Sequence, residues 1–202
     1  MMKTTRVFLL LNGKLPQKIP NLSGYDIICA TDGAYNYLKE NNIVPDFIAG
    51  DFDSIKSLAQ NIETFHTPNQ NFTDFDKIVE ILIQKGCTEI DVFGASGKEQ
   101  DHFIGNLSTA IHYKNRLKMT FYDAHGYYFL AEQKVNITNC LHKTISLIPM
   151  SFVSEVYTEG LEYELVNEHL EMGKKIGTRN KAIKNNISIN HTNGNLFVFV
   201  ND

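Results

Sequence analysis

Apolar segments that stop at glycine, asparagine or aspartate and lead into helix-like segments recur through the first part of the chain. Residues 6–11 stop at Asn12-Gly13, and residues 25–30 stop at Thr31-Asp32-Gly33. Residues 73–85 carry apolar side chains at helical spacing, as an amphipathic helix does. Strand, turn and helix in regular alternation predict an α/β fold class built on a largely parallel sheet.

The pattern changes after about residue 125, where short strand-like segments follow one another and no long helix is expected. These segments are residues 143–149, 152–157, 162–166, 186–191 and 196–200. The Asn193-Gly194 pair between the last two predicts a β-hairpin. We therefore predict a mostly parallel, Rossmann-like α/β domain over residues 1–130, followed by an all-β domain over residues 131–202.

Composition excludes several classes of protein. Hydrophobic residues make up 43% of the 202 residues and charged residues 21%, which is the balance of a globular chain. The formal net charge of −4 argues against a dedicated nucleic-acid binder. The longest early apolar run, residues 7–11, is too short to cross a membrane and lacks the form of a signal peptide. Three widely spaced cysteines predict no disulfide framework, so we expect a cytoplasmic protein with no membrane or nucleic-acid partner.

Acidic residues and glycines gather where the predicted parallel strands end. In open α/β sheets, ligands bind beyond the carboxyl ends of the strands. Asp51 and Asp53 stand two apart on an extended segment, so both carboxylates can face one hard cation. Asp74 and Asp76 repeat the spacing at a helix start, where helix capping is an equally good interpretation. We expect the functional site at this edge of the sheet.

A loop of small residues, Gly94-Ala95-Ser96-Gly97, precedes the helix-like segment that contains Asp101. Small residues let backbone N–H groups approach an anion, and a following helix start favours negative charge. The alternative interpretation is a tight strand-to-helix turn that binds no ligand. Neither a GxxxxGK[ST] loop nor a GxGxxG fingerprint occurs, so any phosphate must be held by another arrangement.

Six groups of residues, in this order and with compatible gaps, together resemble the thiamine pyrophosphokinase family. They are Leu11-Asn12-Gly13 with Pro16; Thr31-Asp32-Gly33-Ala34; Pro45-Asp46 followed by Gly50-Asp51-Phe52-Asp53-Ser54; Gln70-Asn71-Phe72-Thr73-Asp74; Gly94-Ala95-Ser96-Gly97 with Asp101-His102 and Asn106; and Gly177-Thr178 with Asn180. The resemblance implies a catalytic α/β domain followed by a β-sandwich domain for thiamine binding and dimerisation. It also implies a homodimer with the active site at the interface, and transfer of the pyrophosphoryl group of ATP to the hydroxyethyl oxygen of thiamine, giving thiamine diphosphate and AMP.

The resemblance also implies roles for individual residues. The expected ligands of one or two Mg²⁺ ions are Asp51, Asp53, Asp74 and Asp101. Asp101 or Asp74 is expected to take the proton of the attacking alcohol. The residues expected to hold ATP are Asn12, Gly13, Asp32, Gly33, Gln70, Asn71, Thr73 and Ser96. Those expected to hold thiamine are Thr178 and Asn180.

Two positions depart from the family's pattern. Glu99 stands where many relatives have arginine, although Lys98 precedes it, and Arg179 stands where a serine is common. The aromatic residue that stacks on thiamine cannot be a tryptophan, because the chain has none. Two alternatives therefore stay open: a related pyrophosphotransferase with another alcohol acceptor, and a non-catalytic nucleotide- or thiamine-binding module. The complete set of four candidate metal ligands favours an enzyme.

Overall fold

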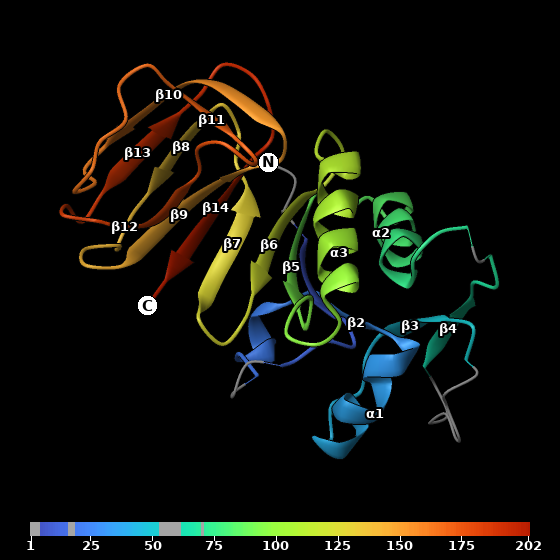
Figure 1. The fold of residues 1–202 in the computed structure, drawn as a ribbon. Coiled ribbons are helices and arrows are strands. Elements are labelled where there is room, and N and C mark those ends of the chain that lie inside the picture. Colours follow the sequence, from blue (N-terminus) through green and yellow to red (C-terminus); the bar gives the residue numbers. More distant parts are fainter. Residues whose placement is uncertain (1–4, 16–18, 53–61, 70) are drawn as a thin grey trace. The chain divides into compact units, whose positions relative to one another are not determined.

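A computed structural model describes residues 5–15, 19–52, 62–69 and 71–202 (Figure 1). Contacts divide the chain into two compact units: an α/β unit, residues 1–124, and a β unit, residues 125–202. No helix in the described part combines the length and apolar character that a membrane crossing requires.

The α/β unit is built on parallel strands, as the alternation of strands and helices predicts. Within its described residues, six strands pair side by side in the order β6–β5–β1–β2–β3–β4, and every pair is parallel. The strands are β1 (Arg6–Leu10), β2 (Ile27–Thr31), β3 (Phe47–Gly50), β4 (Glu63–His66), β5 (Glu89–Phe93) and β6 (Lys118–Tyr122). The connecting elements are η1 (Leu22–Gly24), α1 (Asp32–Glu40), α2 (Asp74–Gln84) and α3 (Gln100–Tyr113).

The order in which the chain adds strands to the sheet reverses between β1 and β5, although the two strands are parallel. From β1 the chain adds β2, β3 and β4 on one side, whereas β5 and β6 lie on the other. At such a switch point, the loops after the two neighbouring strands diverge and leave a crevice for a ligand. The loops concerned begin at Leu11 and Gly94.

Apolar side chains anchor the helices to this sheet. Phe8, Leu10 and Ala30 form one buried cluster with Tyr35 and Leu38 of α1. In α2, four apolar side chains at helical spacing are buried: Phe75, Ile78, Val79 and Leu82. This burial holds α1 and α2 in place, and the first turns of both helices line the pocket described below.

The β unit consists of two antiparallel sheets. One has the order β12–β9–β14–β7, and the other has the order β11–β10–β13–β8. The strands are β7 (Gly126–Leu130), β8 (Lys134–Ile137), β9 (Thr144–Pro149), β10 (Phe152–Glu159), β11 (Glu168–Glu171), β12 (Gly177–Lys181), β13 (Ile187–Asn190) and β14 (Leu196–Asn201). Leu147 and Val198 from the first sheet share one buried cluster with Val153 and Ile189 from the second, as in a β-sandwich.

Two sequence predictions for the β unit are wrong. Residues 162–166 form no strand; the nearby strand is β11, which starts at Glu168. The Asn193-Gly194 turn does not close a hairpin, because β13 pairs with β8 and β10 while β14 pairs with β7 and β9. The turn instead carries the chain from one sheet to the other.

Candidate active site

A pocket of about 460 Å³ lies within the α/β unit, at the switch point between β1 and β5. Its walls come from the segments that follow β1, β2, β3 and β5, and from the first turns of α1, α2 and α3. Most of the residues that sequence reasoning singled out in this unit line it. They are Asn12, Gly13, Asp32, Gly33, Asp51, Thr73, Asp74, Ser96 and Asp101.

Backbone hydrogen bonds join the two loops at the switch point. The N–H of Gly13 donates to the carbonyl oxygen of Gly94 (2.7 Å), and that of Lys14 donates to Ser96 (2.7 Å). A Cβ on Gly13 would overlap the Gly94 carbonyl and lie 2.6 Å from the Ser96 oxygen. Gly13 therefore shapes the pocket by permitting this close approach, and its N–H is already used within the protein.

Asn12 connects this loop to two other parts of the pocket. Its Oδ1 accepts a hydrogen bond from the Lys98 ammonium (3.0 Å). Its side chain lies against Gly33, where an added Cβ would be 2.7 Å from Asn12 Nδ2. Lys98 thus brings a positive charge to the pocket wall, next to the exposed Glu99.

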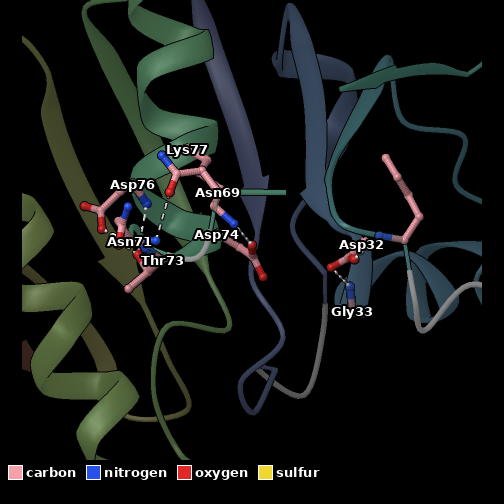
Figure 2. Close-up of polar contacts among 9 residues, drawn as sticks. Asp32, Gly33, Asn69, Asn71, Thr73, Asp74, Asp76 and Lys77 are labelled. Carbon is pink, nitrogen blue, oxygen red and sulfur yellow. Dashed lines mark hydrogen bonds and ion pairs between the residues drawn. The ribbon is translucent and has the colours of Figure 1, made fainter. Parts of the chain in front are cut away.

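Asp32, the first residue of α1, is buried and bound on both carboxylate oxygens. Oδ1 accepts the N–H of Gly33 (2.6 Å; Figure 2), and Oδ2 accepts the N–H of Phe52 (2.9 Å). Burial raises the pKa of Asp32, the two hydrogen bonds oppose that rise, and the charges of Asp74 and Asp51 add to it. Three acidic side chains of the pocket therefore interact electrostatically.

The start of α2 is held by a capping box. The Thr73 hydroxyl accepts the N–H of Asp76 (3.1 Å) and donates to the Asp76 carboxylate (2.8 Å), which also accepts the N–H of Thr73. The other Asp76 oxygen accepts from the buried Thr109 hydroxyl of α3 (2.8 Å). Asp76 is therefore a structural cap that ties α2 to α3, and the predicted ATP contact Thr73 has its hydroxyl engaged in that cap.

Lys77 is a pocket residue that sequence reasoning missed. Its ammonium lies 3.0 Å from Asp74 Oδ1, and its side chain is only 9% exposed (Figure 2). The signal was present, because a lysine three residues after an aspartate lies on the same face of a helix. Asn71, predicted to hold ATP, donates its backbone N–H to Asn69 Oδ1 (2.9 Å) just before this helix.

The first turn of α3 closes the pocket on the side of the glycine loop. Asp101 is exposed, and its Oδ1 accepts the N–H of His102 (2.9 Å). Asn106 donates from Nδ2 to the carbonyl oxygen of Ala95 (2.8 Å), which fixes the helix to the loop. Asp101 thereby stands at the rim with its carboxylate accessible.

The oxygen donors of the pocket suit Mg²⁺, because carboxylates are the protein ligands that this ion prefers. Thr31 adds a buried hydroxyl that has no hydrogen-bond partner among the described residues, and this residue also lines the pocket. Among the described residues, no three His, Cys, Asp or Glu side chains are grouped closely enough to hold a metal. The predicted ligand Asp53 and the predicted ATP contact Gln70 lie outside the described residues, as do Pro16 and Ser54.

In the β unit, Thr178 and Asn180 belong to β12. The Asn180 amide pairs with the backbone of Tyr163, accepting its N–H (3.1 Å) and donating to its carbonyl oxygen (2.7 Å). Arg179 has a left-handed backbone (φ 55°) where the β12–β9 register shifts, and its N–H donates to Ser146 Oγ (2.9 Å). Asn180 thus holds in place an aromatic residue, 69% exposed, that sequence reasoning did not identify.

Comparison with known proteins gives one consistent result. Residues 21–121 match the model of the thiamin pyrophosphokinase catalytic domain, and residues 132–196 match that of the family's vitamin B1 binding domain. Thiamin pyrophosphokinase 1 of Caenorhabditis elegans is 31% identical over 189 residues, covering 83% of this chain and 76% of the relative. Thiamine pyrophosphokinase of Bacillus subtilis is 27% identical over 180 residues, covering 82% of this chain and 84% of the relative.

Solved structures agree on the fold. A crystal structure of thiamine pyrophosphokinase from Bacillus subtilis superposes with a TM-score of 0.85 at 23% identity, covering 98% of this chain and 99% of that one. The enzyme from Candida albicans gives 0.85 at 17% identity, with 98% and 90% coverage. With both family models matched and the C. elegans relative similar over most of its length, the chain belongs to the thiamin pyrophosphokinase family.

Proposed function

We propose that the pocket of the α/β unit is the active site in which this chain transfers the pyrophosphoryl group of ATP to the hydroxyl of thiamine, releasing AMP. The observation that carries this assignment is the pocket's mixture of charges. Asp32, Asp51, Asp74 and Asp101 line it together with Lys77 and Lys98. This wall lies inside the segment that matches the catalytic-domain model.

The lysines and the aspartates of the pocket would bind ATP in different ways. Lys77 and Lys98 supply direct positive charge to a polyphosphate, whose several negative charges would otherwise be repelled by the acids. Asp51, Asp53, Asp74 and Asp101 are the residues that would hold Mg²⁺. Bound Mg²⁺ would neutralise phosphate charge and make the β-phosphorus more electrophilic. The Thr31 hydroxyl offers a further hydrogen bond to the nucleotide.

The proton of the attacking alcohol needs an acceptor within the pocket. Asp74 Oδ1 already forms an ion pair with the Lys77 ammonium, 3.0 Å away. Asp101 stands exposed at the rim, where its carboxylate can reach a second substrate. We therefore assign Asp101 as the acceptor of the hydroxyl proton and Asp74 as a group that binds cations.

Residues of the β unit are proposed to bind thiamine. Thiamine is a cation, and the exposed ring of Tyr163 can bind a cation on its face. Asn180 acts on thiamine through Tyr163, since its amide is paired with the Tyr163 backbone, and Thr178 lies on the same strand. This unit contains the match to the vitamin B1 binding domain.

We make two wider proposals: a homodimer, on the family resemblance, and a cytoplasmic location, on the cysteines. A homodimer would let the thiamine site take residues from both copies, so thiamine affinity should depend on protein concentration. Cys29, Cys87 and Cys140 are all buried and free, which suits the reducing cytoplasm we propose for the protein.

A product assay tests the proposed reaction. Purified protein is incubated with ATP, Mg²⁺ and thiamine, and the nucleotides and thiamine esters are separated. Equal amounts of AMP and thiamine diphosphate are expected, whereas ADP with thiamine monophosphate would contradict pyrophosphoryl transfer. Asp101→Asn should lose most of the rate. Glu89→Gln is the matched control, because Glu89 is exposed at the opposite end of β5.

A further inference from the structure

The buried carboxylate of Asp32 spans two segments that end at the pocket. Its two oxygens accept the N–H of Gly33 within α1 and the N–H of Phe52 beyond β3. The side chain is in contact with Gly50, where an added Cβ would come within 2.7 Å of Asp32 Cβ and still closer to its carboxyl group. The carboxylate therefore bridges the end of β3 and the start of α1.

Phe52 occupies a backbone conformation that needs such support. Its φ of 64° lies in the left-handed region, which costs an L-residue about 1 kcal/mol or more. The residue stands between Asp51 and Asp53, the closely spaced acids of the proposed metal site. Any change in φ at Phe52 turns the chain between these two carboxylates.

We infer that Asp32 is a positioning residue: its carboxylate holds the left-handed backbone of Phe52 and thereby fixes the direction of the neighbouring Asp51 carboxylate, which lines the pocket. This inference rests on the proposed function for the importance of the Asp51 carboxylate, and on hydrogen bonds for the positioning itself. It differs from the sequence-based expectation that Asp32 contacts ATP.

The chemistry of an amide makes the inference testable. Asp32→Asn keeps the size of the side chain, but it replaces one acceptor oxygen by an NH₂ donor, so only one of the two backbone N–H groups keeps a partner. Faster hydrogen exchange at the Phe52 amide is expected, together with a kcat that falls about 10- to 100-fold, as for other residues that orient metal ligands.

The decisive measurement is rescue at position 52. Glycine adopts a positive φ at no steric cost, so Phe52→Gly should restore much of the kcat lost in Asp32→Asn. Phe52→Ala removes the same aromatic ring but keeps the cost of the left-handed conformation. It is therefore the matched control and should restore little. Equal rescue by both, or rescue by neither, would overturn the positioning role and indicate a direct contact between Asp32 and the substrate.

A second variant tests the inference if the Asp32→Asn protein folds poorly. Gly50→Ala keeps the charge of Asp32 but forces its carboxyl group to shift. The Phe52 amide should then exchange faster, and unchanged protection would contradict the inference. Amide exchange requires no turnover. If the wild type made no thiamine diphosphate, the proposed function would be refuted. If the Phe52 amide nevertheless exchanged faster in these variants than in the wild type, the positioning role would still be supported.

Discussion

Replacement of Gly13 by alanine tests whether the pocket depends on the contact between the two switch-point loops. The added methyl group would overlap the Gly94 carbonyl and lie 2.6 Å from the Ser96 oxygen. Both neighbours are backbone atoms, so no side-chain rotation can relieve the overlap. The loops must separate by a substantial part of an ångström.

The expected cost follows from the bonds that this separation breaks. Gly13 to Gly94 and Lys14 to Ser96 are both 2.7 Å hydrogen bonds, and each contributes about 1 kcal/mol. Gly13→Ala should therefore lower the free energy of unfolding by about 2 kcal/mol. For a chain of this size, that corresponds to a Tm lower by roughly 4–8 °C. Because Asn12 and Ser96 move with the loops, kcat/KM for ATP should fall by about 100-fold.

Calorimetry and the product assay measure the two effects on the same sample. Gly105→Ala is the matched control, because Gly105 also lines the pocket but an added Cβ meets nothing within 4 Å. In the interior of α3, alanine should instead stabilise the protein by about 0.5–1 kcal/mol. A Gly13→Ala protein with wild-type Tm and wild-type kcat/KM would refute the argument that close packing of these loops forms the pocket.

Three further predictions concern single side chains. Thr109→Val breaks the bond to Asp76 and leaves a partly buried carboxylate oxygen without this partner, so urea unfolding should show a loss of about 1 kcal/mol that Thr109→Ser does not share. Lys77→Met removes a nearly buried cation, and steady-state kinetics should show kcat/KM for ATP lowered at least about tenfold, with a smaller change for Lys143→Met in the β unit. Burial raises the pKa of Asp32, so its native state binds the proton more tightly than the unfolded chain does. The unfolding free energy of the wild type relative to Asp32→Asn should therefore fall as the pH rises from about 4 to about 7, and a difference that grows over this range would contradict the buried carboxylate.

The elements that sequence reasoning predicted well are those specified by local pattern. The helix expected over residues 73–85 is α2 with its Thr73 cap, because apolar spacing and capping residues act within a few turns. Strand β4 was not predicted, since it is mostly exposed and carries no apolar alternation to indicate it. The hairpin at Asn193-Gly194 failed for a different reason: the pairing of β13 and β14 is decided by strands distant in sequence, and each strand joins a different sheet.

The pocket lies at the strand ends where the sequence predicts a site, but the sequence did not indicate which polar groups are already bonded within the protein. Gly13 and Thr73 resemble ligand contacts in the sequence, yet the structure engages their polar groups in bonds to Gly94 and Asp76. Lys77 had a local signal in its spacing from Asp74, and this signal was overlooked. Tyr163 belongs to no motif with a local chemical meaning, because its partner Asn180 is distant in sequence.

These assignments explain how the chain keeps several acids in one pocket without a bound substrate. Asp32 is the most buried of them, and the negative charges of Asp74 and Asp51 make its ionisation unfavourable. The fold offsets this repulsion with two backbone N–H groups on Asp32 and with the Lys77 ammonium on Asp74. These bonds are present before any ligand arrives, so the acids need little rearrangement when a cation binds. A cation such as Mg²⁺ would relieve the remaining repulsion between the acids. Binding of Mg²⁺ should therefore stabilise the α/β unit more than binding of uncharged adenosine does.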